Sequence, residues 1–185
     1  MHPITRTGIG LVLLLAAFAV QASSRLVDTK WLAQRIEAAE LVLIDMSDNL
    51  QYSRFHLPGA INLPYEYLVQ PVKGVSLSIG QARLVELLGQ LGVTADRHVV
   101  LYDDSGGLHA ARLYWELEQL GHAKLSLLDG GLVKWIREGR PVSGEIPAIK
   151  PAKYQPARTG TPALARLDDV LQAKDTKTRL LDVRS

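Results

Sequence analysis

The side chains best placed for chemistry follow the predicted strand His98 to Tyr102, in a glycine-containing turn that leads into a predicted helix. The turn consists of Asp103, Asp104, Ser105, Gly106, Gly107, Leu108 and His109. His109 is its member that titrates nearest neutral pH, although we expect it to be a surface side chain. An aspartyl-phosphate phosphatase would need a second acid two residues after the first aspartate. Ser105 stands there instead, so we do not favour that chemistry.

Two further polar side chains each have two interpretations. Arg112, on the helix after the turn, could contact an anion or could pair with Glu116, four residues further along the helix. His56 precedes a Leu-Pro-Gly turn and could orient that loop for chemistry or serve as a structural hydrogen-bonding group. We favour the ion pair for Arg112 and the structural role for His56.

Composition excludes several classes of function. The sequence contains no cysteine, so disulfides, thiolate metal sites and thiolate nucleophiles are all excluded for this chain. The five histidines include no pair at the spacing of a metal-binding helix, and we expect neither a metal nor a cofactor. The formal net charge is +2, without a basic run interleaved with aromatic residues, so nucleic acid is not an expected partner.

The N-terminus is typical of an export signal. Arg6 precedes an apolar run from Ile9 to Val20, and the small residues Ala22 and Ser23 follow it. The run is shorter than the roughly 20 residues that span a bilayer. We therefore expect residues 1–22 to be a cleaved signal peptide and the mature protein to be periplasmic or secreted, without a membrane partner.

Short continuously apolar segments alternate with amphipathic ones along the chain, which predicts an α/β fold with a mainly parallel central sheet flanked by helices. The predicted strands are Leu41 to Asp45, a short one after His56, His98 to Tyr102, and Leu125 to Leu128. The predicted helices begin after a cap at Asp28 or Thr29, after a capping box formed by Ser78 and Gln81, at Ala110, and after Gly130.

The chain is expected to contain one complete domain, residues 26–144, followed by a proline-rich linker at 145–162. Residues 163–185 look like the start of a second unit, with a helix Leu164 to Ala173 and a strand Arg179 to Arg184. This order repeats the opening of the first domain, since strands ending in Asp45 and Asp182 each follow a helix. Such a short unit has too few residues to bury its own faces.

Three phrases together resemble the rhodanese (thiosulfate sulfurtransferase) family. They are His56-Leu57-Pro58-Gly59-Ala60-Ile61-Asn62, Val99-Val100-Leu101-Tyr102-Asp103, and Leu128-Asp129-Gly130-Gly131 followed by Trp135 and Gly139-Arg140-Pro141. The resemblance covers about residues 26–144 and the repeat that starts near Leu164. It implies tandem domains of which the first is inactive and the second supplies the catalytic cysteine.

In that family, a cysteine at the end of a central strand lies among backbone N–H groups, takes sulfane sulfur from thiosulfate as a persulfide and passes it to an acceptor. The resemblance places Asp103 at the cysteine position, and a carboxylate cannot form a persulfide. We therefore expect an exported sulfurtransferase family member whose loop Asp103 to His109 is degenerate and whose chain alone is inactive. The alternative is a non-catalytic binding or regulatory module that recognises a small sulfur-containing anion or a partner protein.

Overall fold

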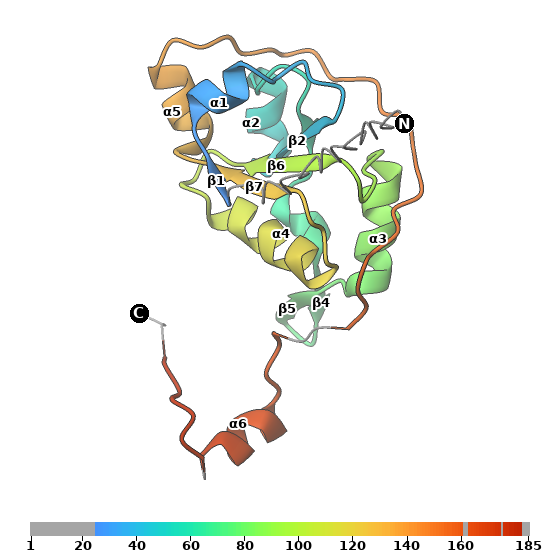
Figure 1. The fold of residues 1–185 in the computed structure, drawn as a ribbon, viewed down its shortest axis with the longest axis vertical. Coiled ribbons are helices and arrows are strands. Elements are labelled where there is room, and N and C mark those ends of the chain that lie inside the picture. Colours follow the sequence, from blue (N-terminus) through green and yellow to red (C-terminus); the bar gives the residue numbers. More distant parts are fainter. Residues whose placement is uncertain (1–24, 161–162, 175, 183–185) are drawn as a thin grey trace, which may run out of the picture.

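The computed structural model describes residues 25–160, 163–174 and 176–182 (Figure 1). Its core is a parallel sheet of five strands. In spatial order they are β1 (Leu26–Val27), β7 (Leu125–Leu128), β6 (His98–Tyr102), β2 (Leu41–Asp45) and β3 (Ile61–Asn62). The predicted α/β class with a mainly parallel sheet is confirmed. The predicted signal peptide lies outside the described residues.

Helices cover both faces of this sheet. Figure 1 shows α1 (Thr29–Ala33), α2 (Asn49–Arg54) and α5 (Gly131–Arg137) on one side, with α4 (Leu108–Gln119) on the other. Val42 and Ile44 of β2 pack with α4 and with α3 (Gln81–Gln90), whereas Leu43 packs with α1 and α5. Because successive strand residues point to opposite faces, an unbroken apolar run is what a strand covered on both sides requires.

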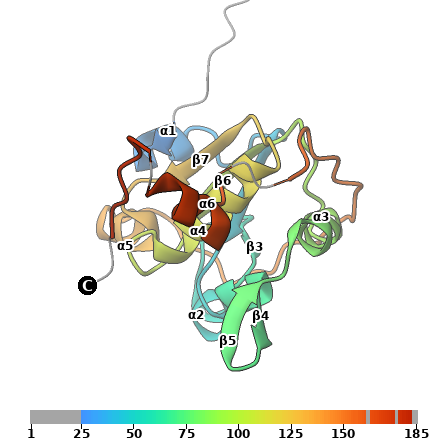
Figure 2. The ribbon, with the colours of Figure 1, turned by 90° about the horizontal axis from the view of Figure 1, so that it is seen from below.

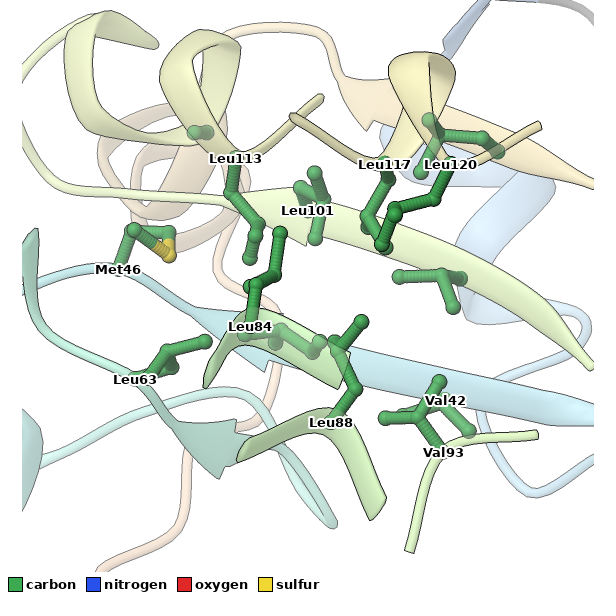
Figure 3. Packing of buried hydrophobic residues seen from close by; sticks show 14 of the residues in the cluster. Val42, Met46, Leu63, Leu84, Leu88, Val93, Leu101, Leu113, Leu117 and Leu120 are labelled. Atoms are coloured by element: carbon green, nitrogen blue, oxygen red, sulfur yellow. The ribbon is translucent and has the colours of Figure 1, made fainter. Parts of the chain in front are cut away.

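The larger of the two apolar layers lies between the sheet and the helices α3 and α4. Figure 3 shows Leu84 and Leu88 of α3 facing Leu113 and Leu117 of α4, with Leu101 of β6 beside them. All five side chains are almost completely buried. Burying a leucine side chain contributes about 1.5–3 kcal/mol, so this layer fixes β6 and α4, the two elements that flank the candidate loop.

The helix boundaries confirm one predicted cap and correct another. The carboxylate of Asp28 accepts the N–H of Trp31 and caps α1 as expected. The capping box of Ser78 and Gln81 is wrong, because α3 begins at Gln81 with Gly80 as its N-cap and no side-chain cap. Ser78 belongs to a strand, and its hydroxyl donates to Glu116 at 3.1 Å.

A hairpin that the sequence analysis did not predict connects the 3₁₀ helix η1 (Tyr65–Leu68) to α3. Its strands are β4 (Val69–Val72) and β5 (Val75–Ser78), paired antiparallel around Lys73 and Gly74. Both turn residues have positive φ, 49° and 79°, as a two-residue hairpin turn requires. Figure 2 shows the hairpin projecting from the body of the domain.

Residues 143–160, which we call the strap, include most of the predicted linker and pack on the domain. Ser143 exchanges two backbone hydrogen bonds of 2.8 Å with His56, and the N–H of Ala152 donates to the carbonyl of Gly89 at 2.8 Å. Tyr154 is 3% exposed and belongs to the core between the sheet and α3. Figure 1 shows the strap running from α5 along the outside of α3. The strap is therefore attached to the domain at several points along its length, and its service as a linker between two units stays a prediction.

The segment after the strap contains one helix, α6 (Leu167–Ala173), which starts three residues later than predicted. Its apolar side chains Leu167 and Leu171 are exposed, and Figure 1 shows α6 standing away from the sheet. The predicted strand Arg179 to Arg184 is not seen in the part that the structure describes, since residues 179–182 have no strand pairing. A second unit stays a prediction.

Candidate functional site

The candidate loop leaves the carboxyl end of β6 and enters the N-terminus of α4. Its residues 103–107 make a tight turn, in which Gly106 and Gly107 both have positive φ, 79° and 92°. Residues with a side chain rarely adopt positive φ, so glycine at both positions lets the chain turn directly into the helix. Carboxyl ends of parallel strands are where α/β proteins usually bind ligands, and the predicted site is therefore at the expected edge of the sheet.

Asp103 is 1% exposed, and its carboxylate accepts four backbone hydrogen bonds from its own loop. Oδ1 accepts the N–H of Ser105 at 3.0 Å and of Gly107 at 2.7 Å. Oδ2 accepts the N–H of His109 at 2.9 Å and of Ala110 at 3.0 Å. The last two groups belong to the first turn of α4, where helix N–H groups otherwise lack partners. The cradle of backbone donors expected here is present, and the carboxylate of Asp103 occupies it.

The backbone of Asp103 is fixed as well as its side chain. Its carbonyl accepts the N–H of Leu132 at 3.0 Å, which ties the loop to the start of α5. Gly131 lies so close that a Cβ atom there would stand 2.5 Å from the same carbonyl oxygen, and its φ is 52°. Gly131, noted in the sequence as part of a motif, is therefore required by the close approach of α5 to the loop.

The remaining predicted loop residues lie at the surface. Asp104, Ser105 and Leu108 are exposed, and Leu108 shows 70% of its area to solvent. His109 is half-buried and stacks on Tyr65 of η1, with ring centroids 5.1 Å apart. The stack gives His109 a packing partner, which differs from the expectation of a plain surface side chain.

Arg112 is directed to Glu116, as the favoured interpretation predicted. Nη2 of the guanidinium lies 2.7 Å from the Glu116 carboxylate, which is nearly buried and also accepts the hydroxyl of Ser78. The guanidinium also lies over the ring of Trp115. Glu116 thus links α4 to the hairpin through Ser78, and the role of Arg112 as an anion contact stays a prediction.

Buried polar groups at the neighbouring strand ends were not singled out as site residues. Asp45 at the end of β2 is fully buried, and burial raises the pKa of its carboxyl above the ordinary value. Its Oδ1 accepts the N–H of Ser47, while Oδ2 has no hydrogen-bond partner among the described residues. Asn62 at the end of β3 donates to the carbonyls of Asp45 and Ser47. The sequence feature that could have identified them is a polar residue at the end of each of these two strands.

Within ranges 25–160, 163–174 and 176–182, no group of three or more histidine or acidic side chains is gathered as a metal would require. Over the same ranges, none of the helices has the length and apolar character needed to cross a bilayer.

A parallel α/β sheet with a loop of backbone donors at the carboxyl end of its central strand is an arrangement in which α/β domains bind ligands. The chain belongs to the family of the Rhodanese-like domain, whose model matches residues 28–138. This confirms the resemblance at family level, while the tandem arrangement is not tested by it.

Relatives of known activity agree with this family. The chain is 32% identical over 166 residues to the sulfur carrier protein TtuD of Thermus thermophilus, covering 86% of this chain and 58% of the relative. It is 37% identical over 119 residues to the thiosulfate sulfurtransferase of Azotobacter vinelandii, covering 63% and 44%. The chain thus spans about half the length of these curated relatives.

A solved structure supports the same fold. The 3-mercaptopyruvate sulfurtransferase SseA from Escherichia coli superposes with a TM-score of 0.72 at 25% identity, over 82% of this chain and 63% of that one. Sulfur transfer is therefore the chemistry of the chain's homologues. The residues of this chain decide which part of that chemistry it could perform.

Proposed function

We propose that this chain forms the non-catalytic rhodanese-like domain of a thiosulfate sulfurtransferase-type protein, with sulfane sulfur carried by a cysteine that this sequence does not contain. The observation that supports it is the carboxylate of Asp103, buried at the end of β6 and bonded to four backbone N–H groups. Sulfur loading needs a thiolate that attacks the outer sulfur of a donor, and the sequence has no cysteine.

The occupied cradle also argues against binding of a free anion in the loop. Oriented N–H groups at a helix N-terminus attract negative charge, and here a covalently attached carboxylate already neutralises them. A second anion a few ångströms away would be repelled by about 4 kcal/mol at an intermediate effective dielectric. Thiosulfate would therefore have to bind elsewhere, and a partner protein is the more compatible ligand for this loop.

Export is a second part of the proposal. Its support is the apolar run from Ile9 to Val20 with the small residues after it. A periplasmic or secreted location is also compatible with the lack of cysteine, since such a domain must be stable through its core alone. Determining the N-terminal residue of the protein recovered from a bacterial periplasm tests this, with Ser23 expected as the first residue.

Thiocyanate formation from thiosulfate and cyanide tests the proposed inactivity. The unmodified chain is expected to produce none above the buffer rate, and turnover by it would overturn the proposal. Asp103→Cys places a thiol at the strand terminus among the four N–H groups, and it is expected to gain a persulfide that mass spectrometry detects. Asp103→Ser is the matched control, since it has a similar size and cannot carry sulfane sulfur.

A further inference from the structure

His56 is completely buried, and both of its ring nitrogens face backbone carbonyl oxygens. Nδ1 lies 2.8 Å from the carbonyl oxygen of Tyr52, and Nε2 lies 3.0 Å from that of Glu145. A carbonyl oxygen can only accept hydrogen bonds, and a neutral imidazole has a proton on only one nitrogen. A neutral His56 would therefore direct a lone pair at one of the two oxygens, whereas the doubly protonated ring bonds to both.

We propose that His56 is an imidazolium in the folded domain and that its two N–H groups form a proton-dependent clamp that fastens the strap to α2. The backbone of His56 takes part too, because it exchanges two hydrogen bonds of 2.8 Å with Ser143 of the strap. Four hydrogen bonds thus join His56 to Ser143 and Glu145 of the strap and to Tyr52 of α2.

The groups that face His56 favour a positive charge there. From α2, the ring of Tyr52 stacks on the imidazole with centroids 3.8 Å apart and planes 11° apart, and an aromatic face attracts a cation. From β2, Asp45 lies near the ring, and burial raises the pKa of its carboxyl while the electrostatic effect of His56 opposes that rise. From β6, the hydroxyl of Tyr102 accepts the N–H of Leu57. The strap contributes the carbonyl of Glu145.

A second buried histidine, His122, also has a partner at each ring nitrogen, but a neutral ring satisfies both of its contacts. His122 has Nε2 3.0 Å from the carbonyl of Arg97, but its Nδ1 lies 2.9 Å from the hydroxyl of Tyr154, which can donate. One proton on Nε2 therefore satisfies both contacts. Both histidines contact the strap, His56 through Glu145 and His122 through Tyr154. Of the two, His56 needs a second ring proton to donate at both of its contacts.

The clamp matters for an apolar cavity of about 420 Å³ beside the edge strand β3. Ile146, Pro147 and Ile149 of the strap form one wall, facing Leu87 and Leu91 at the end of α3. These strap residues directly follow the clamped Glu145. Loss of the His56 proton would free that carbonyl and loosen the wall, so this open pocket would change shape as the pH rises.

Nitrogen-15 NMR of the histidine rings tests the protonation state directly. At about pH 7, close to the ordinary titration range of histidine, His56 is expected to show two protonated ring nitrogens. His122 is the internal control and should show one protonated and one bare nitrogen. A bare nitrogen in His56 under these conditions would overturn the proposal.

Amide exchange tests the clamp. As the pH is raised until the His56 ring loses a proton, the protection factor of the Ser143 amide is expected to fall at least tenfold, while that of Ala152 stays constant. Deprotonation without a loss of protection at Ser143 would show that no such clamp exists. His56→Gln supplies the same comparison at a fixed pH, with Ser143 losing protection and the distant strap amide of Arg158 keeping its own.

Discussion

At the scale of the residue, Asp103 stands where the family resemblance places a catalytic residue, but its contacts give it a structural role. The residue follows the central strand and lies in the cradle, and its carboxylate accepts four hydrogen bonds, all from the loop and the first turn of α4. Since Oδ2 accepts the N–H groups of His109 and Ala110, the side chain acts as a cap for α4 from outside the helix. The buried carboxylate is a structural element of the loop.

Asp103→Ala is therefore expected to destabilise the domain. Removing a cap costs about 1 kcal/mol and leaving buried donors without partners costs about 1–3 kcal/mol, so we expect a loss of about 2–3 kcal/mol. Urea denaturation of the variant and the wild type measures it. Asp104→Ala is the matched control, because Asp104 is exposed and should change stability by less than about 0.5 kcal/mol.

Gly131→Ala tests the close approach of α5 to the loop. The new Cβ would stand 2.5 Å from the carbonyl oxygen of Asp103, so the loop or the helix must move. Gly106→Ala is the control, since it also has positive φ but meets nothing within 4 Å. Strained backbone alone costs about 1–2 kcal/mol, and we expect Gly131→Ala to cost about 2 kcal/mol more than the control in thermal or chemical unfolding. Equal losses of unfolding free energy in the two variants would show that the close contact with Asp103 does not add to the cost.

At the scale of the element, the sequence predicted those strands and helices that show one clear hydrophobic pattern. The strands β2 and β6 were found because each is an almost continuous apolar run, and α3 because its apolar side chains recur at helical spacing. The short helix α2 has only one buried side chain, Tyr52, and therefore shows no periodicity. The hairpin was missed because Pro71 and Gly74 are typical of loops as well as of edge strands.

The strap was interpreted as a linker because its prolines and polar residues show no hydrophobic period. Its attachment depends on single residues that contact distant elements, such as Tyr154 on His122 and Ala152 on Gly89. Composition carries no information about contacts of that kind. At the site, the loop and the position of Asp103 were predicted, whereas the inward direction of its carboxylate depends on backbone geometry that the sequence does not specify.

The contact between His122 and the strap predicts a pH effect on stability. Burial lowers the pKa of His122 below its ordinary value. The folded state thus keeps the ring neutral, and the unfolded chain takes up a proton as the pH falls below about 6.5. The stability that the neutral ring contributes is present above that pH and is lost as the pH falls through the lower folded pKa.

His122→Gln removes this dependence while its amide can still donate to the carbonyl of Arg97. Between about pH 7 and pH 5, the wild type is expected to lose more unfolding free energy than the variant, by at most about 1.4 kcal/mol per pH unit. His98 also has a pKa lowered by burial, and because His122 contributes to that shift, both proteins are compared with His98→Gln added. Parallel pH profiles of the two proteins in urea denaturation would contradict the assignment.

At the scale of the whole molecule, the folded unit extends beyond the part that the family match covers. The match ends at residue 138, and the sequence motifs suggested a boundary at 144. The core between the sheet and α3 is nevertheless completed by Tyr154, and the strap remains in contact as far as Gly160, which is bonded to Gln81. Beyond that point the described residues contact the domain sparsely, with the N–H of Ala163 donating to the side chain of Gln119.

Two truncations test where the folded unit ends. A chain of residues 25–160 is expected to unfold cooperatively with a stability within about 0.5 kcal/mol of residues 25–185, because α6 and its neighbours are exposed. A chain of residues 25–144 loses the buried Tyr154 ring and uncovers apolar side chains of α3, so it should be less stable by about 3–5 kcal/mol. Tyr154→Ala in the 25–160 chain separates the ring from the rest of the strap and should account for most of that loss. Equal unfolding midpoints for the chains ending at 144 and 160 would show that the strap lies on the domain without stabilising it, and the boundary suggested by the motifs would then stand.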